Sequence, residues 1–422
     1  MLTKEKIRQF VDILKEELVP AMGCTEPISI AYAVAKAKSV LGETPVLGKL
    51  AVSGNIVKNA KSVTVPHTGG LRGIRSAFAA GLVGDGEARL EVLSRINETQ
   101  IEEIKRLRDT FPLTVETPEN ARIFDIAVTL KSENHTSFVR IADSHTNVVL
   151  VQRDGETLFE KPLVREGKKT DRSVLCVEDI VAFADAVDTE EVREILQRQI
   201  DYNMAIAEEG IKNDYGANIG KVLLRSYQPD IKTTAKAYAA AASDARMNGC
   251  ELPVIINSGS GNQGLTASIP VIVYARGLHS SLNDLFRALC VSNLVTIHLK
   301  SGIGTLSAYC GVVSAGAGAA CGVAYLLGGR TKEICHTLVN ALAIDSGIIC
   351  DGAKASCAAK IATAVDSGLL GLNMYYNGNQ FYAGDGIVKK GVENTIKSVC
   401  RLAHEGMRET DKEIIRIMLE VE

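Results

Sequence analysis

The chain lacks an excess of charge of either sign. Its 422 residues include 47 Lys and Arg against 50 Asp and Glu, which gives a net charge of -3. Nucleic acids and anionic lipid surfaces attract proteins that gather positive charge on one face. The balanced composition provides no such attraction, so we expect neither a nucleic-acid partner nor a membrane partner.

The N-terminal residues also lack the features of a secretory signal. The segment MLTKEKIRQFVDILKEEL is a charged amphipathic pattern without an uninterrupted apolar core or a small-residue cleavage site. We therefore expect a cytoplasmic protein. In that setting the ten cysteines are expected to be thiols, metal ligands or catalytic groups, because a disulfide framework belongs to secreted chains.

One uncharged run is long enough to cross a bilayer. It covers residues 302–329 and is flanked by Lys300 and Arg330. Glycine and alanine dominate this run, so the energy gained on transfer to lipid is small, and the small side chains allow neighbouring backbones to approach closely. We expect a buried helix of a globular protein, with a membrane span as the alternative.

The remaining sequence indicates a large globular protein of the α+β class. A chain of 422 residues with 46% apolar residues exceeds what one hydrophobic core usually supports. No repeat at a solenoid period is present. Residues 3–19 and about 27–41 have helical patterns, and the chain is helical again from about residue 176 almost to its end.

A different pattern lies between these helical parts. After a charged helix, period-two alternation predicts strands in LTVET, FDIAVTLKS, TSFVRIADS and NVVLVQRDG, and Asp154-Gly155 is a hairpin turn signal. We therefore predict a predominantly helical catalytic domain formed by residues 1–83 and 176–422. A smaller α+β domain with a mainly antiparallel sheet and a linker is inserted at residues 84–175.

Three cysteines could form a metal centre. Cys350 and Cys357 bracket the segment CDGAKASC, and Cys310 precedes the glycine- and alanine-rich run. Thiolates are soft ligands suited to iron–sulfur centres or zinc, and three of them leave one coordination position open for catalysis. The alternative is that they only pack as small apolar residues. The other cysteines that we expect to pack are Cys176, Cys250, Cys290, Cys321, Cys335 and Cys400.

A glycine-rich loop at residues 258–264 is a candidate anion site. Ser258, Gly259 and Asn262 belong to SGSGNQG, which precedes a helix signal and can present N–H groups and hydroxyls. The loop lacks the lysine of a nucleotide phosphate loop, and the strand and acidic partner of the dinucleotide fingerprint do not follow it. We expect it to bind a small carboxylate, with an ordinary turn as the alternative.

A second helix start carries Cys24. Thr25 is a plausible N-cap and Pro27 fits the first turn, so Cys24 would lie where the helix dipole favours an anion. Lys354 could balance the charge of the neighbouring thiolates or be a solvated side chain, and we expect Asp351 to cap the following helix.

The histidines do not form a metal motif. Neither H-E-x-x-H nor H-x-H spacing occurs around His67, His135 or His145. Each is expected to orient its own loop.

These segments together resemble a known superfamily. The segment Met22 to Pro27 (MGCTEP), the Gly54-Asn55 segment with Asn59, the Ser258 to Asn262 loop and the three cysteines resemble the serine dehydratase alpha-chain-like superfamily, essentially end to end. Within it, the chain is most similar to the L-cysteine desulfidase group.

The resemblance implies a lyase that needs no pyridoxal phosphate. An oxygen-sensitive 4Fe–4S cluster would be held by Cys310, Cys350 and Cys357, with Cys24 as the catalytic base. The activity would be elimination of sulfide from L-cysteine, giving pyruvate, ammonia and hydrogen sulfide. The residues expected to bind this small amino acid are Asn55, Asn59, Ser258, Gly259 and Asn262.

Several alternatives stay open. The serine dehydratases of the superfamily space their last two cysteines differently and carry Ser-Ser-Ser-His-Thr-type segments, which favours cysteine over serine here. L-serine dehydration on the same cluster is nevertheless the nearest alternative, followed by a non-catalytic iron–sulfur redox sensor and by a zinc protein or one whose thiols only pack. Glycine-rich, weakly charged helical surfaces favour self-association into a homo-oligomer.

Overall fold

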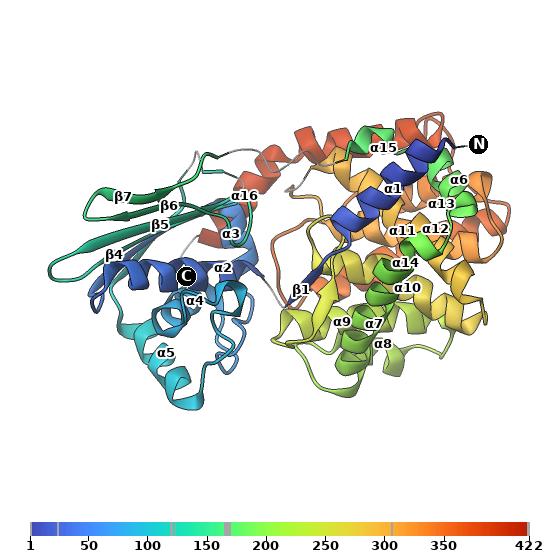
Figure 1. Ribbon diagram of the computed structural model, residues 1–422. Helices are drawn as coiled ribbons and strands as arrows, with labels where there is room; N and C mark the ends of the chain where they lie inside the picture. Colours follow the sequence, from blue (N-terminus) through green and yellow to red (C-terminus); the bar gives the residue numbers. More distant parts are fainter. Residues whose placement is uncertain are drawn as a thin grey trace.

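The computed structural model describes residues 2–22, 25–118, 121–122, 124–163, 170–304 and 307–419. Figure 1 shows two lobes, one built on a sheet and one almost entirely helical. Each lobe has its own hydrophobic core. The α+β fold class predicted from the sequence is confirmed.

The sheet lobe contains a six-stranded sheet in the order β3-β2-β4-β5-β6-β7. Strands β2 and β3 run parallel, and the other neighbouring pairs are antiparallel, so the predicted mainly antiparallel sheet is confirmed. Helix α2 packs against β4, β5 and β6. The elements of this lobe are α2 (Thr25–Leu41), β2 (Leu47–Val52), α3 (Gly54–Ala60), α4 (Gly73–Val83), η1 (Arg89–Glu91), α5 (Glu98–Thr110), β3 (Leu113–Glu116), β4 (Asp125–Lys131), β5 (Thr136–Ala142), β6 (Val148–Arg153) and β7 (Glu156–Glu160).

The predicted strands form because their alternating apolar side chains cover one face of the sheet. In β4 the buried Ile126, Val128 and Leu130 alternate with more exposed residues. The predicted turn Asp154-Gly155 has positive φ at both residues, +51° and +84°, as a two-residue hairpin requires. This turn connects β6 to β7.

The helical lobe surrounds the buried helix α12, which fulfils the expectation for the uncharged run. Gly316 lies so close to α14 that an added Cβ would be 2.4 Å from the Ala364 carbonyl oxygen. Among the described residues, no helix has the length and apolar content needed to cross a bilayer. The elements of this lobe are α1 (Lys4–Glu17), β1 (Pro20–Met22), η2 (Arg172–Val174), α6 (Val177–Ala186), α7 (Glu190–Lys212), α8 (Ile219–Ser226), α9 (Ile231–Met247), β8 (Pro253–Ile255), α10 (Gly261–Gly277), α11 (Leu282–Ile303), α12 (Gly311–Leu326), α13 (Thr331–Ile344), α14 (Cys357–Tyr376), α15 (Val392–Arg401) and the π-helical turn η3 (Leu402–Gly406).

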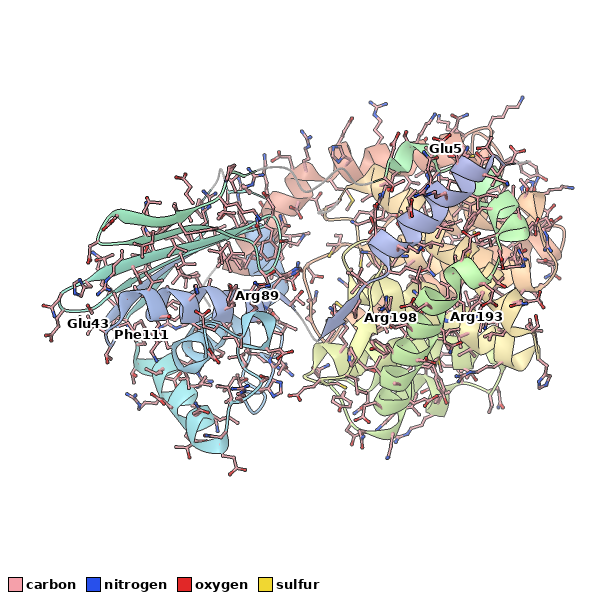
Figure 2. The ribbon with its side chains drawn as sticks, in the orientation of Figure 1. Glu5, Glu43, Arg89, Phe111, Arg193 and Arg198 are labelled. Carbon is pink, nitrogen blue, oxygen red and sulfur yellow. The ribbon has the colours of Figure 1, made fainter. Side chains whose placement is uncertain are left out.

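The two cores are filled by different parts of the chain. Buried residues from Ile28 to Val151 form the core of the sheet lobe, where Phe78 and Phe111 lie 5.7 Å apart between ring centroids. Figure 2 shows Phe111 in the sheet lobe and Arg193 and Arg198 on the helical lobe. The two cores show which residues pack together, but they do not fix where one domain ends along the chain. The domain boundaries predicted at 83/84 and 175/176 therefore stay a prediction.

The C-terminal helix α16 (Arg408–Leu419) connects the lobes. It leaves the helical lobe after η3 and lies beside α3 of the sheet lobe (Figure 1). The contact is close, because a Cβ added to Gly54 would be 2.6 Å from Ile415 Cδ1. Helix α16 thus supports one side of α3, and Asn55, Lys58 and Asn59 of α3 line the space between the lobes.

Candidate active site

A cavity of about 610 Å³ lies between the two lobes. The sheet lobe provides α3, the start of α2 and the turn between β5 and β6. The helical lobe provides the end of α9, the loop before α10, and the segments around the three cysteines. Sites between domains are common places for small ligands.

All described residues that the sequence singled out as site residues line this one cavity. Cys24 lies outside the described residues, although the next residue, Thr25, is in the cavity wall. Helix α2 begins at Thr25, so the expectation that Thr25 is its N-cap is wrong. The residues that the structure brings together here are Asn55, Asn59, Ser258, Gly259, Asn262, Cys310, Cys350 and Cys357.

Cys310 and Cys350 are brought together by an antiparallel bridge between distant segments. Tyr309 pairs with Ile349, the Cys310 N–H donates to the Ile348 carbonyl at 2.8 Å, and the Cys350 N–H donates to Ala308 at 2.6 Å. The bridge places the two thiols within hydrogen-bonding contact. Backbone pairing thus makes neighbours of two residues forty positions apart.

Cys357 joins them through a close approach of the two lobes. It is the first residue of α14, and its thiol lies 3.5 Å from the Gly352 carbonyl oxygen. Gly352 has φ +94°, and an added Cβ would be 1.9 Å from the carbonyl oxygen of Lys58 in α3. Only glycine allows α3 to lie directly against the loop that connects Cys350 to Cys357.

The thiols titrate differently because their neighbours differ. The hydrogen bond from Cys310 lowers the pKa of Cys350, helped by the charges of Lys58 and Lys360 against the effect of burial. The same bond and burial raise the pKa of Cys310. Burial raises the pKa of Cys357 as well. Cys350 is therefore the thiol that is most readily ionised in this group.

Lysines surround the thiols. Lys300 lines the cavity, where burial lowers its pKa and the thiols of Cys350 and Cys310 oppose the shift. Lys58 also lines it and is 2.6 Å from Asp411 of α16. Positive charge near thiolates offsets the cost of keeping negative sulfur away from water.

Asp351 does not cap the helix after it, contrary to the expectation from the sequence. The N-cap residue of α14 is Ser356. The Asp351 carboxylate instead forms ion pairs with Lys354 and Lys360. Burial opposes ionisation, but these two lysines lower the pKa of Asp351 to about 2. Lys354 is thus part of a charge network beside the thiols rather than a solvated side chain.

The loop at residues 258–264 is fixed from beneath by buried amides. Asn257 exchanges backbone hydrogen bonds with Ser260, and its side chain donates to Asn293 at 3.0 Å. Ser258 and Gly259 have positive φ, +50° and +77°. The turn leads into α10 at Gly261, so the free N–H groups of a 17-residue helix begin at the cavity.

Arg246 lies over the start of this helix. Its Nη1 donates to Asn262 Oδ1 at 3.3 Å, and a Cβ added to Gly261 would be 2.3 Å from its Nε. The missing side chain of Gly261 provides the space for the guanidinium. Asn262, which we expected to contact substrate, therefore orients a cation that is itself in the cavity wall.

Among the described residues, four buried side-chain oxygens of the cavity wall have no hydrogen-bond partner. They are Oδ1 of Asn55, Oδ2 of Asp143, Oε1 of Gln263 and the hydroxyl of Tyr309. Gln263 and Tyr309 are only 4% and 1% exposed. Buried polar groups are nearly always paired in native proteins, so unpaired ones beside a cavity indicate a ligand.

His145 is the histidine that the structure brings to the cavity. Its Nε2 is 2.7 Å from the Thr25 hydroxyl, and its ring is edge-on to Phe124 at 4.8 Å between centroids.

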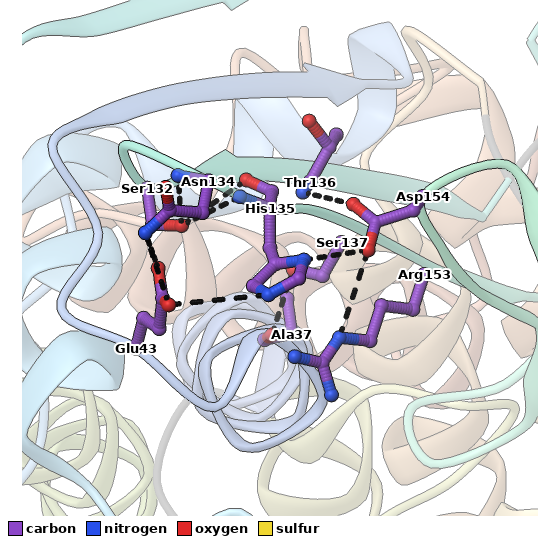
Figure 3. A network of polar contacts seen from close by, with 9 residues as sticks. All are labelled: Ala37, Glu43, Ser132, Asn134, His135, Thr136, Ser137, Arg153 and Asp154. Atoms are coloured by element: carbon purple, nitrogen blue, oxygen red, sulfur yellow. Dashed lines mark hydrogen bonds and ion pairs between the residues drawn. The ribbon is translucent and has the colours of Figure 1, made fainter.

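His135 and His67, the other two histidines considered from the sequence, lie outside the cavity and contact acidic side chains. His135 Nδ1 is 2.7 Å from Asp154 in a network at the β4–β5 turn (Figure 3), and His67 pairs with Glu251. Both arrangements agree with the expectation that they orient loops.

Within the described residues, no group of three or more His, Cys, Asp or Glu side chains is spaced to hold a single metal ion. The cysteines expected to pack are all free thiols. Cys290 and Cys321 are fully buried in the helical core. The three cysteines of the cavity are the ones that share a space able to contain a ligand.

Comparison with known proteins matches this arrangement to a family. Residues 87–416 match the model of the serine dehydratase alpha chain. The chain belongs to the serine dehydratase alpha-chain family. The matched range contains the loop before α10 and all three cysteines of the cavity, and membership of this family indicates a lyase.

Several relatives match this chain over nearly its whole length. A UPF0597 protein of Desulfitobacterium hafniense is 55% identical over 97% of this chain and 96% of its own. A UPF0597 protein of Lachnoclostridium phytofermentans is 51% identical over 98% and 99% of the two chains. A UPF0597 protein of Treponema denticola is 45% identical over 99% of each.

The sequence did not single out Arg246, Gln263 or Tyr309. Arg246 lies in the last turn of α9, where a basic residue usually stabilises the end of the helix. Gln263 had a signal, because it belongs to the glycine-rich loop. Tyr309 precedes Cys310, and its burial depends on the bridge to Ile349, which is a tertiary contact.

Proposed function

We propose that this family member is an iron–sulfur-dependent lyase that needs no pyridoxal phosphate and eliminates sulfide from L-cysteine. The products would be pyruvate, ammonia and hydrogen sulfide. The observation that carries the proposal is that Cys310, Cys350 and Cys357 line one inter-lobe cavity together with charged and polar groups. Family membership supports the reaction class, and the likeness of its motifs to the L-cysteine desulfidase group supports the substrate.

The donor set fits a 4Fe–4S cluster better than a single ion. Within the described residues, the three thiols are not spaced to hold one metal ion. A cluster has separate iron atoms, each of which takes its own thiolate, so its ligands surround a volume. Cys310, Cys350 and Cys357 would hold it, and when bound it would supply a Lewis-acidic iron with an open position.

The chain's own residues would handle protons and charge. Cys24 would take the Cα proton, since it precedes a helix whose dipole favours a thiolate. General base catalysis of this kind contributes about 100- to 10,000-fold to a rate. His145, hydrogen-bonded to the adjacent Thr25, would hold this stretch of the wall in place. Lys58 and Lys300 would stabilise negative charge near the thiols.

The elimination balances without an oxidant or reductant. The Cα–H bond breaks, its electron pair forms the double bond to Cβ, and the Cβ–S bond breaks to release sulfide. The aminoacrylate that remains tautomerises and takes up water, giving pyruvate and ammonia. The cavity is needed for the first stage only, because the later steps proceed in water.

The test is an anaerobic preparation analysed for iron, for acid-labile sulfide and for sulfide released from L-cysteine. We expect an iron–sulfur absorption spectrum and sulfide release that falls at least about 100-fold in Cys24→Ala. An undiminished rate in this variant would remove Cys24 from the mechanism. A colourless protein that stays colourless after anaerobic reconstitution with iron and sulfide would contradict the cluster.

L-serine dehydration on the same cluster is the second candidate, because the matching family model is that of the serine dehydratase alpha chain. Pyruvate formation from serine and cysteine at equal concentrations separates the two. We expect the larger kcat/KM with cysteine.

A further inference from the structure

We infer that the cavity recognises both charged groups of an α-amino acid: Arg246 binds the carboxylate, and the side-chain oxygens of Asn55 and Gln263 bind the ammonium group. This inference rests on the proposed function and extends it by naming residues that select the substrate class. Of the three, only Asn55 was expected to bind substrate from the sequence.

The carboxylate end is built on the start of α10. Arg246 provides a delocalised cation with a fork of donors that matches a carboxylate. Asn262 holds one arm of the guanidinium, and Gly261 leaves the space that the rest of it occupies. The free N–H groups of α10 add partial positive charge at the same place. An anion is therefore favoured at this end by two independent structural features.

The ammonium end consists of acceptors. Oδ1 of Asn55 and Oε1 of Gln263 are buried and have no hydrogen-bond partner in the part of the chain that the structure describes. An unpaired buried acceptor destabilises the protein, so each of these oxygens favours a ligand that brings a donor. An ammonium group offers three N–H donors and no acceptor, whereas a carboxylate would repel both oxygens. The two amides thus suit the amine of the substrate.

The two ends lie close to the thiols. The Gln263 amide packs against Gly311, where an added Cβ would be 2.5 Å from its Cδ, and Gly311 follows Cys310 directly. Asn55 and Gln263 come from different lobes, since α3 belongs to the sheet lobe and α10 to the helical lobe. A bound ammonium group would therefore bridge the two lobes beside the cysteines. The Cβ substituent of the same amino acid would then face the cysteines.

The test pairs variants with ligands that lack one charged group. L-cysteine carries both groups, 3-mercaptopropionate lacks the ammonium, and cysteamine lacks the carboxylate. The anaerobic holoprotein is measured for the KM of cysteine, the inhibition constants of the other two, and the ligand-induced rise in Tm. The variants are Arg246→Met, Gln263→Leu and Asn55→Ala. Arg276→Met, which removes an exposed arginine at the C-terminal end of α10, is the control.

Each variant is expected to weaken binding only of those ligands that carry the charged group it recognises, which gives a crossed pattern of affinities. Arg246→Met weakens cysteine and 3-mercaptopropionate about 10- to 100-fold and leaves cysteamine unchanged. Gln263→Leu and Asn55→Ala weaken cysteine and cysteamine about 5- to 10-fold or more and leave 3-mercaptopropionate unchanged. Arg276→Met changes none of the three.

Two further variants protect the test against misfolding. Gly261→Ala keeps Arg246 but forces its guanidinium to move, so it should reproduce the loss of 3-mercaptopropionate binding at little cost in Tm. Arg246→Lys keeps the charge and should recover part of that binding.

Uniform losses for all three ligands, or no loss, would overturn the inference. If the wild type releases sulfide but shows no crossed pattern, the inference fails and the proposed function stands. If the Tm shifts are crossed but no sulfide is released, the proposed elimination fails and amino-acid recognition stands.

Discussion

Lys58 Nζ lies 2.6 Å from Asp411 Oδ1, and this ion pair joins the cavity helix α3 to the C-terminal helix α16. The Lys58 side chain is only 4% exposed, whereas Asp411 is 23% exposed. The end of the chain thus supports a wall of the candidate active site. Because α16 comes from the helical lobe, the pair also links the position of that wall to the other side of the cavity.

Asp411→Asn should therefore destabilise the protein by about 1–3 kcal/mol, since it leaves a buried ammonium group without its counter-charge. Urea unfolding of the two proteins at equal pH measures the difference. Glu409→Gln is the matched control on the same helix, where the pair with Lys412 is largely exposed and contributes little to stability. Equal losses of unfolding free energy in the two variants would show that the Lys58–Asp411 ion pair stabilises the protein no more than the exposed pair does.

His145 and His135 provide a matched pair for a second prediction. His145→Ala removes the hydrogen bond to Thr25 beside Cys24 and should lower kcat by about tenfold or more. His145→Gln, whose amide can still bond to Thr25, should recover part of that loss. His135→Ala disrupts the network of Figure 3, remote from the cavity, and should leave kcat unchanged. A kcat of His145→Ala equal to that of the wild type would exclude a positioning role.

The strands were predictable where apolar side chains alternate, and β2 shows where this signal fails. Its buried positions are Gly48, Leu50 and Val52. Gly48 has no side chain of its own, and the ring of Phe78 fills the space, so that an added Cβ would be 2.5 Å from Phe78 Cζ. The strand lies inside the sheet because a distant phenylalanine supplies the apolar group that its own sequence lacks.

The candidate site was predictable in its residue types but not in its assembly. Cysteine spacing and the glycine-rich loop indicated thiol ligands and an anion site. The bridge between Tyr309 and Ile349, which makes neighbours of Cys310 and Cys350, is a tertiary contact without a local signal. Arg246 is similar, because its role depends on the empty space above Gly261 in another helix. The local sequence pattern therefore identifies which residues can react or bind, whereas tertiary packing determines which of them lie together.

Gly352 provides a third prediction. Gly352→Ala adds a Cβ 1.9 Å from the Lys58 carbonyl oxygen at a residue with φ +94°, so both the contact and the backbone conformation are strained. The loop connecting Cys350 to Cys357 must shift away from α3. We expect fewer iron atoms per chain after anaerobic reconstitution and a lower Tm. Gly378→Ala, also at positive φ but with no atom near its added Cβ among the described residues, separates backbone strain from the contact.

Asp244 should make stability depend on pH. Burial raises the pKa of Asp244 to about 6, although the Gly220 N–H donates to its carboxylate. A folded pKa above the unfolded value means that stability is fullest below about pH 4 and is lost as the pH rises through 6. Asp244→Asn keeps an acceptor for Gly220 and removes the charge. Its gain over the wild type should grow by about 1–2 kcal/mol between pH 4.5 and 7.5 in urea unfolding. A gain that does not change with pH would show that Asp244 is not the titrating group.

Cys310 lies just before α12 and Cys321 lies within it, so the two residues test whether thiols bind a cluster or only pack. Cys310 precedes α12 and faces the cavity, whereas Cys321 is fully buried in the helical core. Cys310→Ala should abolish the iron–sulfur absorption with little change in the far-UV circular dichroism, because one of three ligands is lost while the packing defect is small. Cys321→Ala should retain the absorption and lower stability by about 1 kcal/mol, because only a buried sulfur is removed.

If both variants keep their iron, Cys310 is a packing residue like Cys321, and the cluster must be held by other groups. If both lose it, the loss follows from disturbed packing of α12 and carries no information on ligation. The proposed cluster therefore predicts a difference between two cysteines of one helix, which no general effect of cysteine replacement would produce.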